Sequence, residues 1–153
     1  MRAVTHATLG DAGNARAALR TAEKLAERSG GEPRWPWVFA FDATKAARYQ
    51  ASVLGALGDV RAARSAYDGA GITALAPKPR ALAQVAHAEV LACAGMVGEG
   101  CTLALEALTV GRRYGSERIT VRVRDFRTTL PARTAEAAEL DEALAALYEQ
   151  ESW

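Results

Sequence analysis

The stretch Lys78–Arg113, KPRALAQVAHAEVLACAGMVGEGCTLALEALTVGRR, decides the fold. Apolar residues recur in it at spacings of three and four on both sides of Gly95, which is the spacing of one face of an α-helix. Gly95 favours a break between two helices, because glycine readily adopts the left-handed backbone that ends a helix. The stretch therefore predicts two helices, over 80–94 and 97–114, joined by a tight turn.

The same pattern, a leucine four positions before a glycine, occurs twice upstream, so the expected turn glycines are Gly13, Gly58 and Gly95. They are 45 and 37 residues apart. The glycine turns and this spacing resemble those of tetratricopeptide repeats, whose period is about 34 residues. In that family a small residue falls five positions after the turn glycine, where two helices cross closely. The residues at this position are Ala18, Ala63 and Gly100.

Helical periodicity extends over the rest of the chain. The interpretation is a single all-α domain over 1–153, a tetratricopeptide-like stack of antiparallel helical hairpins with about seven helices. Its expected parts are hairpins over 2–28, 42–72 and 80–114, followed by terminal helices over 116–130 and 134–150. A β-branched run begins at Ile119 and is compatible with a strand, but the spacing of Ile119, Val123 and Phe126 indicates a helix.

Composition and charge exclude several classes of protein. The 19 basic and 18 acidic residues give a formal net charge of +1, so overall charge predicts no partner. The sequence has no run of about 18 apolar residues, and no membrane span is expected. The N-terminus lacks the apolar stretch of a signal peptide. Cys93 and Cys101 fall in apolar helical patterns, so we expect two reduced, buried thiols and a cytoplasmic location.

The sequence presents no clear catalytic, cofactor or metal set. The glycines from Gly95 to Gly100 follow a helix rather than a strand and lack the Lys-Ser/Thr of a phosphate loop, so a turn and a close helix crossing explain them. His87 and Cys93 are separated by about 600° of helical rotation and point to different faces. We expect no metal, no cofactor and no catalytic residue. The alternative is a small-molecule-binding protein or a small enzyme whose pocket is assembled from distant residues.

Aromatic residues supply the first candidate binding site. The segment WPWVFAF, residues 35–41, holds two of the 3 tryptophans and two of the 3 phenylalanines, and Pro36 argues against a helix there. Core packing between hairpins is the ordinary role of such residues, and a pocket wall or a self-association patch is the alternative. The candidate binding residues are Trp35, Trp37, Phe39, Phe41 and, on the following helix, Tyr49.

Arginines supply the second candidate. Seven of them lie between positions 112 and 133, opposed by Glu117 and Asp125, whereas the helix expected over 134–150 carries acidic residues and no basic one. Two adjacent helices with complementary solvated faces are the ordinary explanation, and a face that docks an acidic partner is the alternative. Direct nucleic-acid binding is not expected, because aromatics are not interleaved with the arginines. Arg118 and Arg122 are the candidate contact residues.

About residues 35–130 also resemble a known family. Three segments carry this resemblance, and they are the string Trp35–Asp42, the turn Leu57-Gly58-Asp59, and the helix end Glu106–Arg113 followed by Ser116-Glu117-Arg118. All three are similar to a region found in one class of regulator. It is the C-terminal tetratricopeptide-like region of actinobacterial Xre-type helix-turn-helix transcriptional regulators. The resemblance implies a helical region that senses a ligand or partner and assembles dimers. The DNA-binding domain of the family has no counterpart here, because the hairpins are expected to start at residue 2.

These observations together predict a non-enzymatic protein-interaction or effector-sensing module. Its expected partner is a protein or peptide, or a small effector, and a homodimer is the expected self-assembly. The sequence predicts neither direct nucleic-acid binding nor membrane association.

Overall fold

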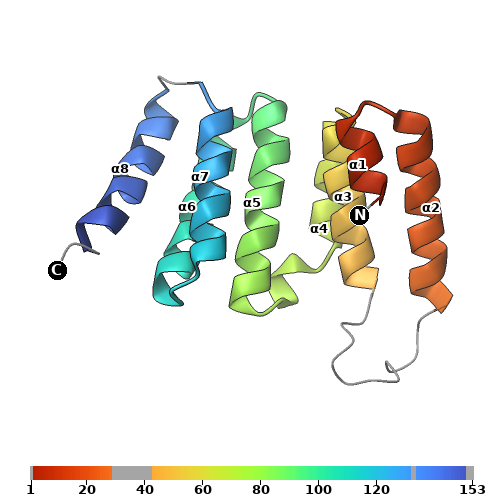
Figure 1. Ribbon diagram of the computed structural model, residues 1–153, viewed down its shortest axis with the longest axis horizontal. Helices are drawn as coiled ribbons and strands as arrows, with labels where there is room; N and C mark the ends of the chain where they lie inside the picture. Colours follow the sequence, from red (N-terminus) through yellow and green to blue (C-terminus); the bar gives the residue numbers. More distant parts are fainter. Residues whose placement is uncertain (1, 29–42, 132–133, 151–153) are drawn as a thin grey trace. The chain divides into compact units, whose positions relative to one another are not determined.

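Helices make up nearly all of the structure, a computed structural model that describes residues 2–28, 43–131 and 134–150 (Figure 1). Over these residues the chain forms eight α-helices and no strand, which confirms the all-α prediction. In chain order the helices are α1 (Arg2–Thr8), α2 (Ala12–Arg28), α3 (Ala43–Ala56), α4 (Val60–Gly69), α5 (Pro77–Cys93), α6 (Val97–Arg113), α7 (Glu117–Thr129) and α8 (Ala135–Gln150). A short 3-10 helix, Ile72–Ala74, follows α4.

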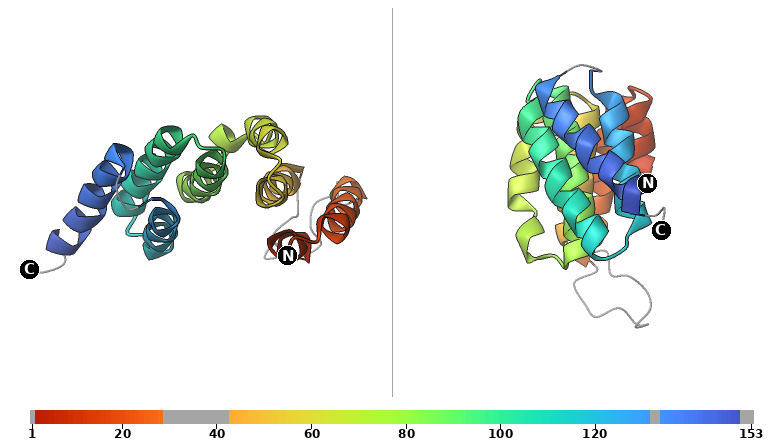
Figure 2. Two further views of the ribbon diagram at one scale, coloured as in Figure 1. Left: turned by 90° about the horizontal axis from the view of Figure 1, so that it is seen from above. Right: turned by 90° about the vertical axis from the view of Figure 1, so that its left-hand side faces the viewer.

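The chain divides into two compact units, unit 1 (Met1–Ile72) and unit 2 (Thr73–Trp153). In unit 1, α1 and α2 form one antiparallel hairpin, α3 and α4 form another, and α3 packs against both α1 and α2. In unit 2, α5 and α6 form the hairpin, α7 packs against both of its helices, and α8 packs against α6 and α7 (Figure 2). No helix of the described residues is long and apolar enough to cross a membrane.

The two units differ in the size of the side chains in their cores. The buried cluster of unit 1 joins three helices through small side chains and consists of Ala7, Ala15, Leu19 and Val53. In unit 2 the largest fully buried side chains belong to α5, α6, α7 and α8 and are Phe126, Leu108, Ile119, Leu140, Val85 and Val123. Burial of large apolar side chains is the main stabilising contribution to a fold.

One turn geometry recurs at four helix ends. The turn glycine has a positive φ in each case, 74° at Gly10, 79° at Gly58, 80° at Gly95 and 54° at Gly115. In each turn the next residue donates its backbone N–H to the carbonyl five positions earlier, with N···O distances from 2.8 to 2.9 Å. This bond satisfies a carbonyl at the helix end that has no partner within the helix. Three turns close the hairpins, and the fourth joins α6 to α7.

The first turn corrects the predicted register. Gly13 lies inside α2, and the turn glycine is Gly10. Asp11 then caps α2, since its Oδ1 accepts the N–H of Asn14 at 3.1 Å, as Asp59 caps α4 by accepting the N–H of Ala62 at 3.2 Å. Glycine, asparagine and aspartate all favour turns, so position alone did not separate the two candidate breaks.

With Gly10 as the first turn glycine, small residues recur at the same position after each turn. Counted from the turn glycines, the fifth positions are Ala15, Ala63 and Gly100, and all three are buried. Ala18, the residue expected from the Gly13 register, is only half-buried. The predicted close helix crossing is therefore confirmed at Gly100, where an added Cβ would lie 3.0 Å from the Ala88 carbonyl oxygen, and the predicted burial holds at Ala63, whereas Ala18 is not the small residue of the first bend.

Three other side chains lie elsewhere than predicted. The leucine before the first predicted bend, Leu9, would face inward if it were part of a packed helix, but it belongs to the turn and is 76% exposed. Cys101 is buried as expected, whereas Cys93 is exposed at the C-terminal end of α5. Tyr49, placed on the apolar stripe of its helix, is 43% exposed. The aromatic segment 35–41 lies outside the described residues.

Candidate functional site

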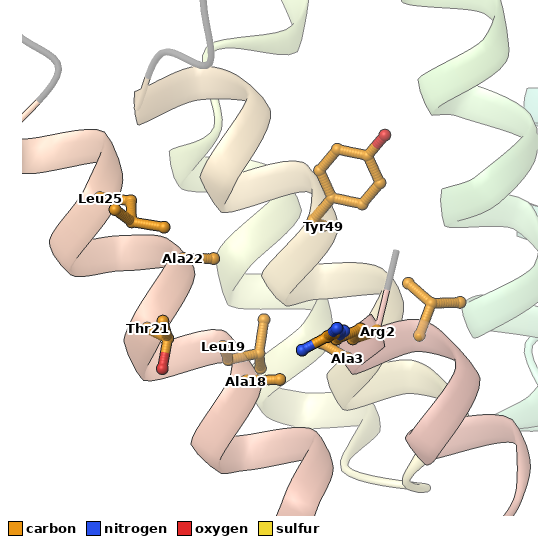
Figure 3. Close-up of a pocket in the computed structure, with 9 residues that line it drawn as sticks. Arg2, Ala3, Ala18, Leu19, Thr21, Ala22, Leu25 and Tyr49 are labelled. Atoms are coloured by element: carbon orange, nitrogen blue, oxygen red, sulfur yellow. The ribbon is translucent and has the colours of Figure 1, made fainter.

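A pocket of about 340 Å³ opens in unit 1 between α1, α2 and α3 (Figure 3). Its wall on α2 is formed by a run of small and apolar side chains, which includes Ala18, Leu19, Ala22 and Leu25. The first turn of α1 supplies one end, and Tyr49 of α3 supplies the facing side. The lining is thus mainly apolar, with few polar groups.

The pocket lies beside the first turn of α1, the shortest of the three helices. α1 has 7 residues, whereas α2 has 17 and α3 has 14. α2 and α3 run on past the N-terminal end of α1, as Figure 1 shows. Where α1 is present, Ala7 is 3% exposed and Ala15 and Val53 are fully buried. Beyond α1 the same faces of α2 and α3 line the pocket, so we call this feature the α1 extension groove.

Two large apolar side chains of the groove face solvent. Leu25 is 54% exposed and Tyr49 is 43% exposed. Arg2 and Thr21 are the side chains in the lining that carry a charge or a hydroxyl in addition to the Tyr49 phenol. A mainly apolar concavity with a few polar groups at its margin is the usual form of a site that binds an apolar ligand or an apolar segment of a partner.

Sequence reasoning identified Tyr49 as a binding candidate and missed Leu25. On α2 the residues Ala18, Ala22 and Leu25 are spaced four and three apart, and all three line the pocket. Periodicity shows which face of a helix is apolar, but not whether a neighbouring helix is long enough to cover that face. Trp35, Trp37, Phe39 and Phe41 lie outside the described residues, so their predicted roles stay predictions.

The predicted arginine residues belong to unit 2. Arg122 of α7 donates through Nη2 to Glu89 Oε1 of α5 at 2.9 Å, which ties these two helices together. Arg118 lies one turn earlier on α7 and is exposed. Burial raises the pKa of Glu89, and Asp125 adds to this effect while Arg122 opposes it. A role of Arg122 in holding α5 and α7 together is therefore shown, and partner binding by Arg118 stays a prediction.

A second ion pair bears out the interpretation of complementary helix faces. Arg127 of α7 donates to both carboxylate oxygens of Asp141 on α8, at 2.7 and 2.8 Å. The hydrogen bond from Arg127 is the main cause that lowers the pKa of Asp141. The arginine-rich helix and the acidic helix are thus neighbours that pair directly at this point.

No three His, Cys, Asp or Glu residues in the described ranges lie close enough together to hold a metal ion. His6 Nδ1 lies 3.4 Å from Asp11 Oδ2 beside the first turn, where both side chains are partly exposed. Burial raises the pKa of the Cys101 thiol, and nearby carboxylates such as Glu136 raise it further. A raised pKa lowers the nucleophilicity of a thiol at neutral pH.

No family model, curated protein or solved structure matches this chain. The functional inference therefore depends on the geometry and chemistry of the described residues.

Proposed function

We propose that the protein is a non-enzymatic interaction module, and that the α1 extension groove binds an apolar helical segment of a partner protein. The observation that carries this proposal is that the groove is continuous with the surface of α2 and α3 on which α1 packs. The faces of α2 and α3 that pack against α1 also line the pocket, through Ala18, Leu19, Ala22, Leu25 and Tyr49. A surface that accepts one helix has the shape and spacing to accept another.

The dimensions of the groove set the size of the partner segment. At about 1.5 Å per residue, the 17 residues of α2 span about 25 Å and the 7 residues of α1 about 10 Å, which leaves on the order of 15 Å of α2 beyond α1. This length corresponds to two or three turns of helix. Such a segment would place apolar residues spaced three and four apart against Ala22, Leu25 and Tyr49, in the way an amphipathic helix binds a groove.

Several features support an interaction role. Tyrosine is enriched at the energetic centres of interfaces, and apolar side chains exposed together around it mark an interaction surface. The resemblance to the helical regions of Xre-type regulators agrees with a cytoplasmic module that senses a partner or effector. The homodimer implied by that resemblance stays a prediction, as does a small effector as the natural ligand. A pocket of about 340 Å³ also lies within the size range of small-molecule sites, which makes an apolar effector the second candidate.

The proposal is tested with a fluorescent peptide of about 12 residues, stapled as a helix, with leucine and alanine on one face and lysine and glutamine on the other. Fluorescence anisotropy should show saturable binding to the full chain. Leu25→Glu and Ala22→Glu should weaken binding at least about tenfold, because each places a charge against the apolar face of the peptide. The matched control is Leu9→Glu, since Leu9 is 76% exposed in the same unit but away from the groove.

Equal weakening by Leu9→Glu and Leu25→Glu would overturn the assignment of the groove, and absence of binding to the wild type would overturn the helical partner. A thermal-shift screen of apolar metabolites supplies the competing outcome. Stabilisation by such a molecule, lost in Leu25→Glu and kept in Leu9→Glu, would identify the pocket as an effector site in place of a peptide groove. Circular dichroism confirms that each variant remains helical.

A further inference from the structure

A second hollow of about 400 Å³ lies wholly within unit 2, between the N-terminal half of α5 and the C-terminal half of α6. The two stretches come together because the turn at Gly95 makes α5 and α6 antiparallel, so that Arg80 and Arg113 lie at the same end of the hairpin. The side chains that matter to its chemistry are Arg80, Gln84, Glu106, Thr109, Arg113 and Tyr114. We call this feature the basic hollow.

The charges around the basic hollow are mostly positive. Arg80 and Arg113 both line it, and Glu106 is the acidic residue of its lining. Glu106 Oε2 is engaged by the Gln84 amide, whose Nε2 donates to it at 2.8 Å. Two guanidinium groups that share a hollow repel each other, and an anion bound between them removes this repulsion.

Tyr114 holds the basic side chains at one edge of the hollow. The Lys78 Nζ lies 5.9 Å from the centre of the Tyr114 ring, and the Arg113 Cζ lies 5.6 Å from it. Both distances fall within the range of about 6 Å over which a cation is attracted to an aromatic ring. The Tyr114 ring therefore attracts both Lys78 and Arg113 without neutralising either charge, and Arg113 lines the hollow together with Arg80.

Arg80 has an unused hydrogen-bond donor. Its Nη2 donates to the backbone carbonyl of Leu75 at 3.1 Å, which fixes the guanidinium group against the start of α5. Its Nε is buried and finds no acceptor among the described residues. The guanidinium group carries further N–H donors besides these two, and such charged donors form strong hydrogen bonds to the oxygens of a carboxylate or phosphate.

We propose that the basic hollow binds a small oxyanion, a carboxylate or phosphate group, between Arg80 and Arg113. Thr109 and Gln84 supply neutral hydrogen-bonding groups for the rest of such a ligand, and Tyr114 positions Arg113 and Lys78 at the edge. The site is independent of the α1 extension groove, because it uses residues of unit 2 alone.

The test uses the full chain and two probes, inorganic phosphate and succinate, each titrated against sodium chloride at equal ionic strength. Heteronuclear NMR should show saturable shifts of the Arg80, Thr109 and Tyr114 amides with at least one probe. Saturation by phosphate alone would assign a phosphoryl ligand, and saturation by succinate alone would assign a carboxylate ligand. If sodium chloride reproduces the shifts, or neither probe saturates, the proposal is overturned.

Variants separate a built site from general charge attraction. Arg80→Gln and Arg113→Gln should each weaken binding roughly tenfold, since charge-assisted bonds to an oxyanion are lost. Arg118→Gln removes the same charge from the exposed surface of α7 and should leave binding within about twofold. Tyr114→Leu keeps the net charge and should still weaken binding, because Lys78 and Arg113 lose the ring that positions them. Equal losses in Arg113→Gln and Arg118→Gln would contradict the proposal, and Leu25→Glu in unit 1 should have no effect.

Discussion

Gly100 of α6 lies directly against the backbone of Ala88 on α5. A Cβ placed on Gly100 would come within 3.0 Å of the Ala88 carbonyl oxygen and within 3.4 Å of the Phe126 ring. Neither neighbour can move easily, because one is helix backbone and the other belongs to the core of unit 2. We expect Gly100→Ala to destabilise the protein by about 1–3 kcal/mol through overpacking, although alanine favours a helix by about 1 kcal/mol over glycine. Thermal or urea unfolding measures the difference.

Gly69→Ala is the matched control for this substitution. Gly69 is the last residue of α4, and a Cβ there would meet nothing within 4 Å. This variant should be neutral or stabilise the protein by up to about 1 kcal/mol. Destabilisation of similar size in both variants would show that the close approach of Gly100 to Ala88 is not the cause of the lost stability.

The corrected first turn gives a second prediction, on two glycines three residues apart. Gly10 has a φ of 74°, which strains any other residue, so Gly10→Ala should destabilise unit 1 by about 1 kcal/mol or more. Gly13 lies in α2, where an added Cβ would meet Asp11 Oδ1 at 3.9 Å, an ordinary van der Waals contact, and Gly13→Ala should instead stabilise the protein by a few tenths to about 1 kcal/mol. Chemical denaturation of both variants decides the register, and the opposite order of stabilities would restore Gly13 as the turn.

The two cysteines should differ in reactivity. Cys93 is exposed, whereas Cys101 is buried in the core of unit 2 with a pKa that burial raises. Titration of the native protein with a thiol reagent at neutral pH should modify one thiol rapidly, and mass spectrometry should locate it at Cys93. The second thiol should react after denaturation, and rapid modification of Cys101 in the native protein would contradict its burial.

Glu89 should reduce stability at neutral pH even though it pairs with Arg122. Burial raises its pKa above the ordinary value of 4.5, so the folded state binds the proton more tightly than the unfolded state does. Stability is then lost as the pH rises from about 4.5 through the folded-state pKa. Glu89→Gln keeps a hydrogen-bond acceptor for Arg122 and should raise the midpoint of thermal unfolding at pH 7, with the gain vanishing at low pH.

For Asp141→Asn we expect a change in stability at pH 7 opposite to that of Glu89→Gln. The hydrogen bond from Arg127 lowers the pKa of Asp141 below 3.8, so the stabilisation is present above that pH and is lost as the pH falls through the folded-state pKa. This variant should unfold at a lower temperature than the wild type at pH 7 and approach it in acid. Parallel pH profiles for the two variants would contradict the causes assigned to these shifts.

Much of the helical architecture could be predicted, because each apolar stripe depends on residues close in sequence. Ile119, Val123 and Phe126 are all fully buried on α7, and their spacing outweighed the β-branched run. The first bend was misplaced because Gly10-Asp11 and Gly13-Asn14 have the same turn chemistry. Gly58-Asp59, with its capping aspartate, was the better guide to the true register.

The pockets depend on information that periodicity does not contain. The α1 extension groove brings together residues of three helices, so Tyr49 could be selected as an aromatic but not placed in one pocket with Leu25. Arg80 and Arg113 lie 33 positions apart in sequence, and only the antiparallel pairing of α5 and α6 brings them to one hollow. The density of arginines along the chain instead predicted a binding face on α7.

The hydrogen bonds at the four glycine bends are all made within a few consecutive residues. Each bend can therefore form without help from any distant part of the polypeptide. A whole pair of helices can therefore be duplicated or deleted during evolution without disrupting the neighbouring glycine turns. We expect homologues to differ in length by complete helix pairs more often than by fragments of a helix.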